Sequence, residues 1–192
     1  MANELIAKPR LSHIWDREAN EHYVEPSWCS ERLFQVEKFD GAIHDPCCGF
    51  GTIPEAANRA GYLATGDDLV DRGYSGGRDF FVVSGAHDNI VCNPPFNIAK
   101  EFTEHALTVT FYKVAIIFPI ARLNAARWMR EAPLRRVWLL TPRPSMPPGH
   151  VIAAGERPGG GKMDFCWLVF EHGYVGAAEM GWLHRDGVEN GE

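Results

Sequence analysis

Short apolar runs alternate along the chain with segments whose apolar residues recur at helical spacing. The runs that predict strands lie at residues 41–46, 62–68, 89–92, 113–119, 135–142 and 164–171. Helices are predicted at 52–60 and 99–108, with a basic helix around 124–130, while 78–85 is ambiguous between a strand and a short helix. Several strand runs are continuously apolar, which is typical of strands in a parallel sheet with both faces covered.

This order of elements predicts an α/β protein with a Rossmann-like, doubly wound, mostly parallel sheet. Residues 142–161, between the last two strands, are irregular and rich in Pro and Gly, so no crossover helix separates these strands. We therefore expect the last two strands to pair antiparallel, with the antiparallel strand at one edge of the sheet. Upstream, residues 22–39 indicate an entry segment and then an amphipathic helix that begins near Pro26 or Ser27.

A chain of 192 residues with 45% hydrophobic residues is long enough for one domain with a full core. We treat 1–192 as a single domain, with 1–20 as an N-terminal extension and 145–162 as a flexible loop. There is no apolar run of about 18 residues, and charges interrupt the N-terminal segment. We therefore expect a cytoplasmic protein that does not associate with membranes.

Five cysteines, at positions 29, 47, 48, 92 and 166, form no C-x-x-C pair. This spacing argues against a disulfide framework and against a zinc knuckle, so we expect reduced thiols and no metal site. The neighbouring Cys47 and Cys48 could pack in a tight loop, form a vicinal disulfide or bind a metal.

The net charge of −6 is unevenly distributed. Residues 113–162 contain nine Lys or Arg and two acidic residues, so this segment carries +7 while the rest of the chain carries −13. Such asymmetry can create a positive face for a polyanion, although scattered arginines on a solvated face would produce the same count.

The stretch HDPCCGFGTIPEAA supplies a glycine turn directly after the first predicted strand. Ligands of open α/β sheets bind at the carboxyl ends of the strands, and Gly49 and Gly51 let the backbone approach a ligand closely. Pro54 occupies the third glycine position of the dinucleotide fingerprint and the P-loop lysine is missing, which argues against both phosphate cradles. Asp45, just before the turn, suits a cationic ligand. The adjacent His44 is more simply a core residue than a catalyst.

Acidic and aromatic residues follow the next two predicted elements. Asp68 lies 19 residues after Gly49, where a carboxylate can accept hydrogen bonds from ribose hydroxyls; Asp67 is the alternative, and both could instead cap a turn. Asp79 and Phe80 are placed to address a nucleoside base.

The motif NPPF follows the apolar strand DNIVC. Each proline fixes φ and removes a backbone donor, so the chain after Asn93 is stiff and extended. Taken alone, the motif is also compatible with a simple turn that ends the strand.

With these motifs in this order, the chain resembles the class I S-adenosylmethionine-dependent methyltransferases, and within them the small phage and prophage-type DNA N6-adenine methyltransferases. The resemblance rests on DPCCGFGTIPEAA, GDDLVDRG, RDFF and NPPF, with 48 residues from Asp45 to Asn93, and it covers roughly residues 20–185. HYVEPSW resembles the entry pattern Y-x-T-P-x-W, but Glu25 stands where that pattern has threonine. The resemblance implies S-adenosyl-L-methionine as cofactor, bound by Tyr23, Pro26, Asp45, Pro46, Gly49, Gly51, Asp68, Asp79, Phe80 and Asn93.

The same resemblance implies a catalytic role for Asn93, Pro94, Pro95 and Phe96. The exocyclic amine of adenine is a poor nucleophile because its lone pair is delocalised into the ring. The side-chain oxygen of Asn93 and the carbonyl of Pro94 would accept its hydrogens, Phe96 would stack on the base, and Pro95 would keep the geometry. Direct transfer of the methyl group then needs no metal and no covalent enzyme intermediate.

Nucleic acid is the expected partner, with DNA favoured over RNA. An adenine in a duplex would have to be flipped out, and loop 145–162 is a possible target contact. The residues expected to hold the nucleic acid are Arg122, Arg127, Arg130, Arg143, Arg157 and Lys162. Because the same motif serves adenine in RNA and, in a close variant, glutamine amides in proteins, these substrates stay open, as does a non-catalytic nucleotide-binding module.

Overall fold

A sheet with strand order β2-β1-β3-β4-β6-β5-β7 forms the centre of the computed structural model, which describes residues 22–82, 85–156 and 159–187. The strands are β1 (Ile43–Asp45), β2 (Ala64–Gly66), β3 (His87–Cys92), β4 (Thr110–Pro119), β5 (Leu134–Thr141), β6 (Phe165–Glu171) and β7 (Glu179–His184). Strands β1 to β4 are mutually parallel, and β6 runs antiparallel to both β4 and β5. The carboxyl ends of β1, β2 and β3 therefore meet at one edge of the sheet.

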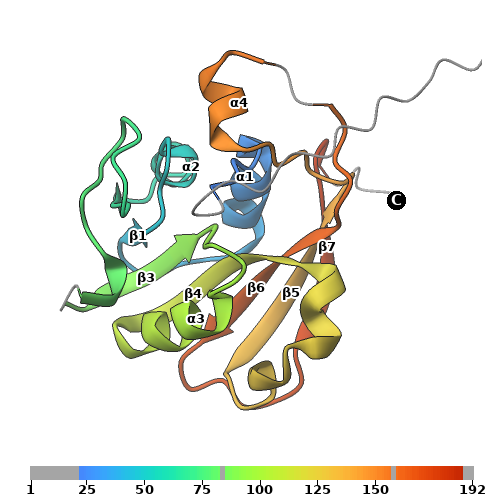
Figure 1. Cartoon of the computed structure of the whole chain (residues 1–192). Coiled ribbons are helices and arrows are strands. Elements are labelled where there is room, and N and C mark those ends of the chain that lie inside the picture. The colour runs from blue at the N-terminus through green and yellow to red at the C-terminus, as the bar shows by residue number, and fades with distance from the viewer. Residues whose placement is uncertain (1–21, 83–84, 157–158, 188–192) are drawn as a thin grey trace, which may run out of the picture.

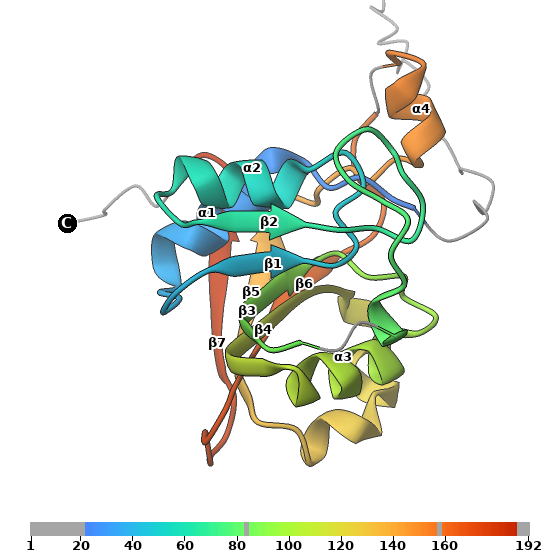
Figure 2. The ribbon, with the colours of Figure 1, turned by 90° about the vertical axis from the view of Figure 1, so that its left-hand side faces the viewer.

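Helices cover both faces of the sheet (Figures 1 and 2). On one face lie α1 (Ser27–Val36) and α2 (Thr52–Arg59). On the other lie α3 (Ala99–Thr108) and two short 3-10 helices, η3 (Ile120–Ala125) and η4 (Arg127–Arg130). A fourth α-helix, α4 (Gly149–Ala153), lies off the sheet, and its first residues pair with the segment that leads into α1.

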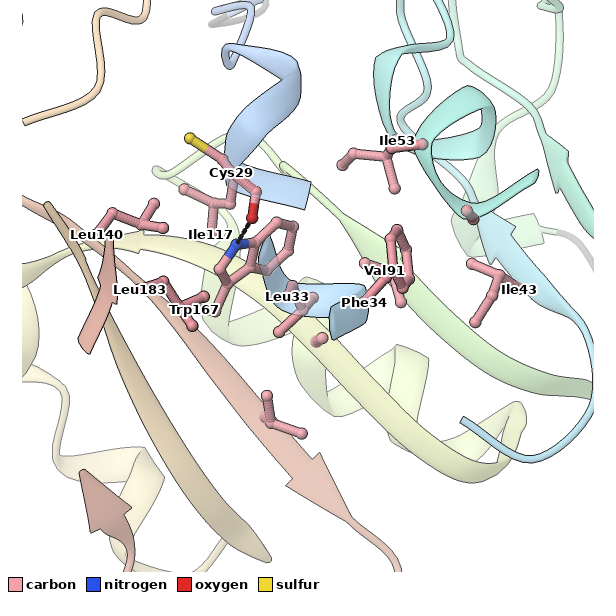
Figure 3. Close-up of a cluster of buried hydrophobic side chains, with 14 of the residues drawn as sticks. Cys29, Leu33, Phe34, Ile43, Ile53, Val91, Ile117, Leu140, Trp167 and Leu183 are labelled. Carbon is pink, nitrogen blue, oxygen red and sulfur yellow. Dashed lines mark hydrogen bonds between the residues drawn. The ribbon is translucent and has the colours of Figure 1, made fainter. Parts of the chain in front are cut away.

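The continuously apolar strands serve two cores, because successive side chains of a strand point to opposite faces. On β3 and β6, Val91 and Trp167 pack toward α1 and α2, while Ile90 and Leu168 pack toward α3. Trp167 is fully buried, and its indole Nε1 donates to the backbone carbonyl of Cys29 at 3.0 Å, which docks α1 on the sheet (Figure 3).

The predicted fold class and the six predicted strands are confirmed, but the antiparallel strand is not at the edge. Strand β6 lies between β4 and β5, and the edge strand is β7, which pairs parallel to β5. The pattern explains the difference. Residues 165–170 of β6 are all buried, whereas Met180 and Trp182 of β7 are 62% and 53% exposed, so β7 has too little apolar periodicity for the sequence to reveal it.

Three further segments differ from their predictions. The basic segment 124–130 forms 3-10 turns of η3 and η4 instead of an α-helix, because proline bounds both ends of the short connection between β4 and β5 at positions 119 and 133. The ambiguous segment 78–85 contains the 3-10 turn η2 (Phe80–Val82). The predicted loop 145–162 contains α4. Within the described ranges, no helix is long and apolar enough to cross a membrane.

Candidate functional site

A cavity of about 250 Å³ opens where β1, β2 and β3 end. Its walls come from four segments: 22–25 before α1, 46–52 after β1, 68–81 after β2, and 93–102 after β3. The sequence-predicted residues on these walls are Tyr23, Pro46, Gly49, Asp68, Asp79, Phe80, Asn93 and Pro95. The predicted site residues Pro26, Asp45, Gly51, Pro94 and Phe96 lie outside the lining.

The two glycines of the turn after β1 have different structural roles. Gly49 has φ +51°, its N–H donates to Asp68 Oδ2 at 2.9 Å, and a Cβ at this position would meet the ring of His22 at 2.6 Å. Gly51 has φ +86° and caps the start of α2, and a Cβ there would overlap the ring of Tyr74. The close approach of backbone to cavity that we predicted for both positions therefore applies to Gly49, while Gly51 shapes the helix entry.

Asp45 stabilises the glycine turn through a hydrogen bond with the backbone. It is 1% exposed at the end of β1, and its Oδ1 accepts a hydrogen bond from the Cys47 N–H at 3.0 Å. Burial raises the pKa of Asp45 well above its usual range, and the nearby carboxylates of Glu25 and Asp68 raise it further. Like Asp45, Pro26 is set back from the cavity, at the N-cap of α1.

Asp68, shortly after β2, lines the cavity and also forms a hydrogen bond with the glycine turn after β1. Its carboxylate is 8% exposed and accepts from the Gly49 N–H and from Arg72 Nη1, at 3.2 Å. The alternative, Asp67, is absent from the cavity lining; Arg78 Nη1 donates to its Oδ2 at 3.4 Å.

The segment RDFF brings two adjacent rings to the cavity wall. Phe80 is 7% exposed and also packs on Phe102 with ring centroids 4.9 Å apart, and Phe81 is 42% exposed. Asp79 Oδ1 accepts from the Phe81 N–H at 3.0 Å. Phe80 was predicted from the sequence and Phe81 was not, although two adjacent rings in a turn were an available signal for both.

Asn93 directly follows β3, and two hydrogen bonds fix its side-chain amide. Its Nδ2 donates to the carbonyl of Tyr23 at 2.8 Å and to Glu25 Oε2 at 2.9 Å. Its Oδ1 is buried and has no hydrogen-bond partner among the residues that the structure describes. Pro94 is buried, and the ring of Phe96 lies nearly parallel to that of Tyr23, with centroids 6.4 Å apart and planes at 6°.

Glu25 is a further cavity residue, visible in the sequence only as a departure from the entry pattern. It is 7% exposed, and burial raises the pKa of this carboxyl to about 7, although the hydrogen bond from Asn93 opposes the shift. Its position in the cavity wall puts a third carboxyl group there, besides those of Asp68 and Asp79.

The arginines predicted to hold nucleic acid fall into two groups. Arg122, Arg127 and Arg130 are exposed on η3 and η4, and Arg122 Nη1 donates to the carbonyl of Phe96 at 2.8 Å. Arg143 instead forms a two-point ion pair with Asp164, at 2.6 and 3.0 Å. Lys162 is exposed, and Arg157 lies outside the described residues.

Part of the positive charge of segment 113–162 is neutralised within the fold. Lys113 and Arg136 bind Glu37 at 3.1 Å, and Arg135 binds Glu171 at 2.8 Å. Among the described residues of this segment, the arginines of η3 and η4 and Lys162 stay exposed outside these ion pairs and could meet a polyanion. The described residues hold no group of three or more His, Cys, Asp or Glu suited to a metal ion, and the five cysteines are free thiols.

The fold is similar to that of several solved methyltransferases. A candidate RNA methyltransferase from Pyrococcus horikoshii superposes with a TM-score of 0.57 at 12% identity, covering 76% of this chain and 82% of that one. The modification subunit of a candidate type I restriction enzyme from Vibrio vulnificus gives 0.56 at 12% identity, covering 89% of this chain but 48% of that one. The magnesium protoporphyrin IX methyltransferase of Synechocystis, solved with bound S-adenosylmethionine, gives 0.50 at 14% identity over 76% of each chain.

No protein-family model matches the sequence, and no curated protein matches it either. At these identities the structural likenesses establish the fold, and the chemistry has to be argued from the site.

Proposed function

We propose that the protein transfers the methyl group of S-adenosyl-L-methionine to the exocyclic N6 amine of adenine in nucleic acid, with DNA the favoured substrate. The observation that carries the proposal is the state of Asn93. Its amide nitrogen is held by two acceptors while its oxygen is buried without a partner among the described residues, at the carboxyl end of β3 and beside the cavity. A buried acceptor left open in this way matches a substrate that brings a donor.

The cavity has the chemistry expected for a cationic nucleoside. Glu25 and Asp68 bring carboxyl groups to its wall, and Asp45 lies buried behind the turn. S-adenosylmethionine would supply an electrophilic methyl group on a sulfonium centre. The backbone at Gly49 would lie against the ligand, Asp68 would accept from its ribose, and Asp79 and Phe81 would face its adenine.

Asn93 and the carbonyl of Pro94 would act on the target amine. Two acceptors that bind the amine hydrogens draw the nitrogen out of conjugation with the ring and direct its lone pair toward the cavity. Orientation of this kind accelerates a reaction only when the geometry is held, and the two prolines and the buried hydrogen bonds of Asn93 hold it. Phe96 and Tyr23, whose rings are nearly parallel, would provide the aromatic surface for the base.

The exposed arginines of η3 and η4 would bind the phosphates around a flipped adenine. Arg122 connects this surface to the catalytic segment through its hydrogen bond to the carbonyl of Phe96. The choice of DNA over RNA rests on the resemblance to small phage-type enzymes. The structural neighbours include both a candidate RNA methyltransferase and a modification subunit, so the fold is neutral between the two.

Incubation with labelled cofactor and three substrates in parallel tests the proposal: unmethylated DNA, RNA, and a protein extract, each followed by hydrolysis and product analysis. We expect label in N6-methyladenine from DNA. Label in RNA only, or in a protein amide, would overturn the substrate assignment. A calorimetric titration that detects no binding of S-adenosylmethionine would overturn the activity as a whole.

Asn93→Ala should separate chemistry from cofactor binding. Removing an acceptor that acts on the reacting amine should lower kcat by about 100-fold or more, comparable to the loss of one transition-state hydrogen bond. The cofactor Kd should change by no more than about threefold, since the walls formed by Gly49 and Asp68 stay in place. Asn124→Ala, at an exposed position on η3, is the matched control and should keep wild-type kinetics. Equal loss of binding and turnover would mean that Asn93 is structural.

A further inference from the structure

The amide of Asn93 is held by a segment that lies about 70 residues earlier in the chain. Both of its partners there are acceptors: the carbonyl of Tyr23, which can only accept, and the carboxylate of Glu25, which accepts when ionised. An Asn side chain rotated by 180° would place its oxygen against these two oxygens. The pair therefore selects one of the two orientations of the amide.

The selected orientation leaves Oδ1 as the free end. A buried acceptor without a hydrogen bond destabilises a fold, so this arrangement is kept at the expense of stability. Without the Glu25 carboxylate, the amide could rotate, and Oδ1 could accept a hydrogen bond from another group. The loss of stability has a functional reason if Oδ1 must point toward a donor that enters the cavity.

We propose that Glu25 is a positioning residue, whose carboxylate fixes the amide of Asn93 so that Oδ1 accepts a hydrogen from the amine to be methylated. The inference rests on the proposed function and extends it to a residue that departs from the entry pattern, where threonine is usual. Glu25 acts through Asn93 and forms no bond with the transferred group.

The buried environment of Glu25 makes its hydrogen bond with the Asn93 amide dependent on pH. The titratable and charged groups around it are Asp45 from β1, Cys92 from β3, Cys29 and Glu31 from α1, and Glu55 and Arg59 from α2. Burial raises the pKa of Glu25 to about 7. A protonated Glu25 can donate to Oδ1 of a rotated amide, whereas the ionised form only accepts. Turnover should therefore rise with pH through about 7.

Two variants of Glu25 and one control test the proposal in the full chain. Glu25→Leu removes the acceptor at similar volume, and kcat should fall by about tenfold or more with the cofactor Kd within about threefold of wild type. Glu25→Gln can both accept and donate, as the protonated carboxyl does, so kcat should stay near the low-pH level of the wild type at every pH and lose the rise near 7. Glu31→Gln removes a half-exposed carboxylate of the neighbouring helix and should behave as wild type.

The outcomes that overturn the positioning role are distinct. Wild-type kcat in Glu25→Leu would exclude it. A weakened cofactor Kd with unchanged kcat would assign Glu25 to cofactor binding instead, and a pH limb that persists in Glu25→Gln would belong to another group, such as Asp45.

A spectroscopic measurement separates this proposal from the proposed function. The side-chain NH₂ signal of Asn93, identified by its loss in Asn93→Ala, should be shifted and slow to exchange in the wild type above pH 7, and should lose both properties in Glu25→Leu. If the wild-type protein methylated no nucleic acid, the proposed function would fail, while this signal would still report whether Glu25 holds the amide. An Asn93 signal that is identical in the wild type and in Glu25→Leu would show that Glu25 does not hold the amide.

Discussion

At the scale of single residues, a buried and a partly buried histidine ring show how packing sets protonation. His44 of β1 and His87 stack with centroids 4.2 Å apart and planes at 3°. Burial, helped by the neighbouring His87 and Arg78, lowers the pKa of His44 to about 4, against the attraction of Asp67 at 3.8 Å. Both rings are absent from the cavity lining, in keeping with the expectation that His44 is a core residue.

This stack predicts a loss of stability in acid. In the unfolded chain His44 has its ordinary pKa of 6.5, whereas in the folded protein its pKa is about 4. Between these two pH values the unfolded state therefore binds more protons than the folded state. The free energy of unfolding should fall as pH drops from about 6.5 to about 4, by at most about 3 kcal/mol from His44. Urea unfolding at several pH values measures this slope.

His44→Gln should flatten the slope, and His184→Gln, exposed on β7, should keep it. The raised pKa of Glu25 acts in the opposite direction, because its folded form holds a proton up to about 7. It does so equally in both variants, so their difference isolates His44. Parallel slopes in wild type and His44→Gln would contradict the assignment.

At the scale of elements, a buried carboxylate joins one helix to two strands. Glu37 ends α1 and is 1% exposed. It accepts from Lys113 of β4 at 3.1 Å, and from Arg136 and Trp138 Nε1 of β5 at 3.1 and 2.9 Å. This network of hydrogen bonds fixes the position of the C-terminal end of α1 on the sheet. It thereby helps to position the segment before α1 that contains Tyr23 and Glu25.

Breaking this network should cost more than breaking a surface pair. Glu37→Gln removes the buried counter-charge that Lys113 and Arg136 share and leaves each of them only a more exposed glutamate, so it should lower the free energy of unfolding by about 3 kcal/mol. Glu179→Gln removes a 61% exposed partner of the same Arg136 and should cost less than about 1 kcal/mol. Denaturant titration of both variants checks the contrast, and equal losses would show that the contacts of Glu37 contribute no more than a surface ion pair.

At the scale of the whole molecule, the charge that reaches the surface differs from the charge in the sequence. Ion pairs with glutamates neutralise Lys113 of β4 and Arg135 and Arg136 of β5, while the arginines of η3 and η4 stay exposed, with Arg122 hydrogen-bonded to the carbonyl of Phe96. An acidic protein can thus present a local cationic surface where a polyanion has to dock.

This arrangement predicts which arginines set the salt dependence of nucleic-acid binding. The affinity should fall steeply with added salt, and the double variant Arg127→Gln and Arg130→Gln should reduce the slope of log K against log salt by about 2. Arg185→Gln, paired with Asp186 on the surface, should leave the slope unchanged. Fluorescence anisotropy with a short DNA duplex measures these slopes. An unchanged slope in the double variant would remove η4 from the interface.

Local sequence features determined much of the fold. Continuous apolar runs predicted both the strands and their burial on two faces, since the period of a strand is short and each run carries its own signal. Gly49, Asp68 and Asn93 lie around one cavity, because the carboxyl ends of adjacent parallel strands meet at one edge of the sheet.

The tertiary structure alone decided the features that depend on contacts between distant segments. Burial on both sides placed β6 inside the sheet and left the exposed β7 at its edge. Ion pairs neutralise part of the basic segment, and the fold brings both Phe80 and its neighbour Phe81 to the cavity. The hydrogen bond between Asn93 and Glu25 joins residues that are 68 positions apart in the sequence, and no local pattern predicts it. Sequence thus specified which groups are available, and long-range packing determined which of their atoms remain free to react.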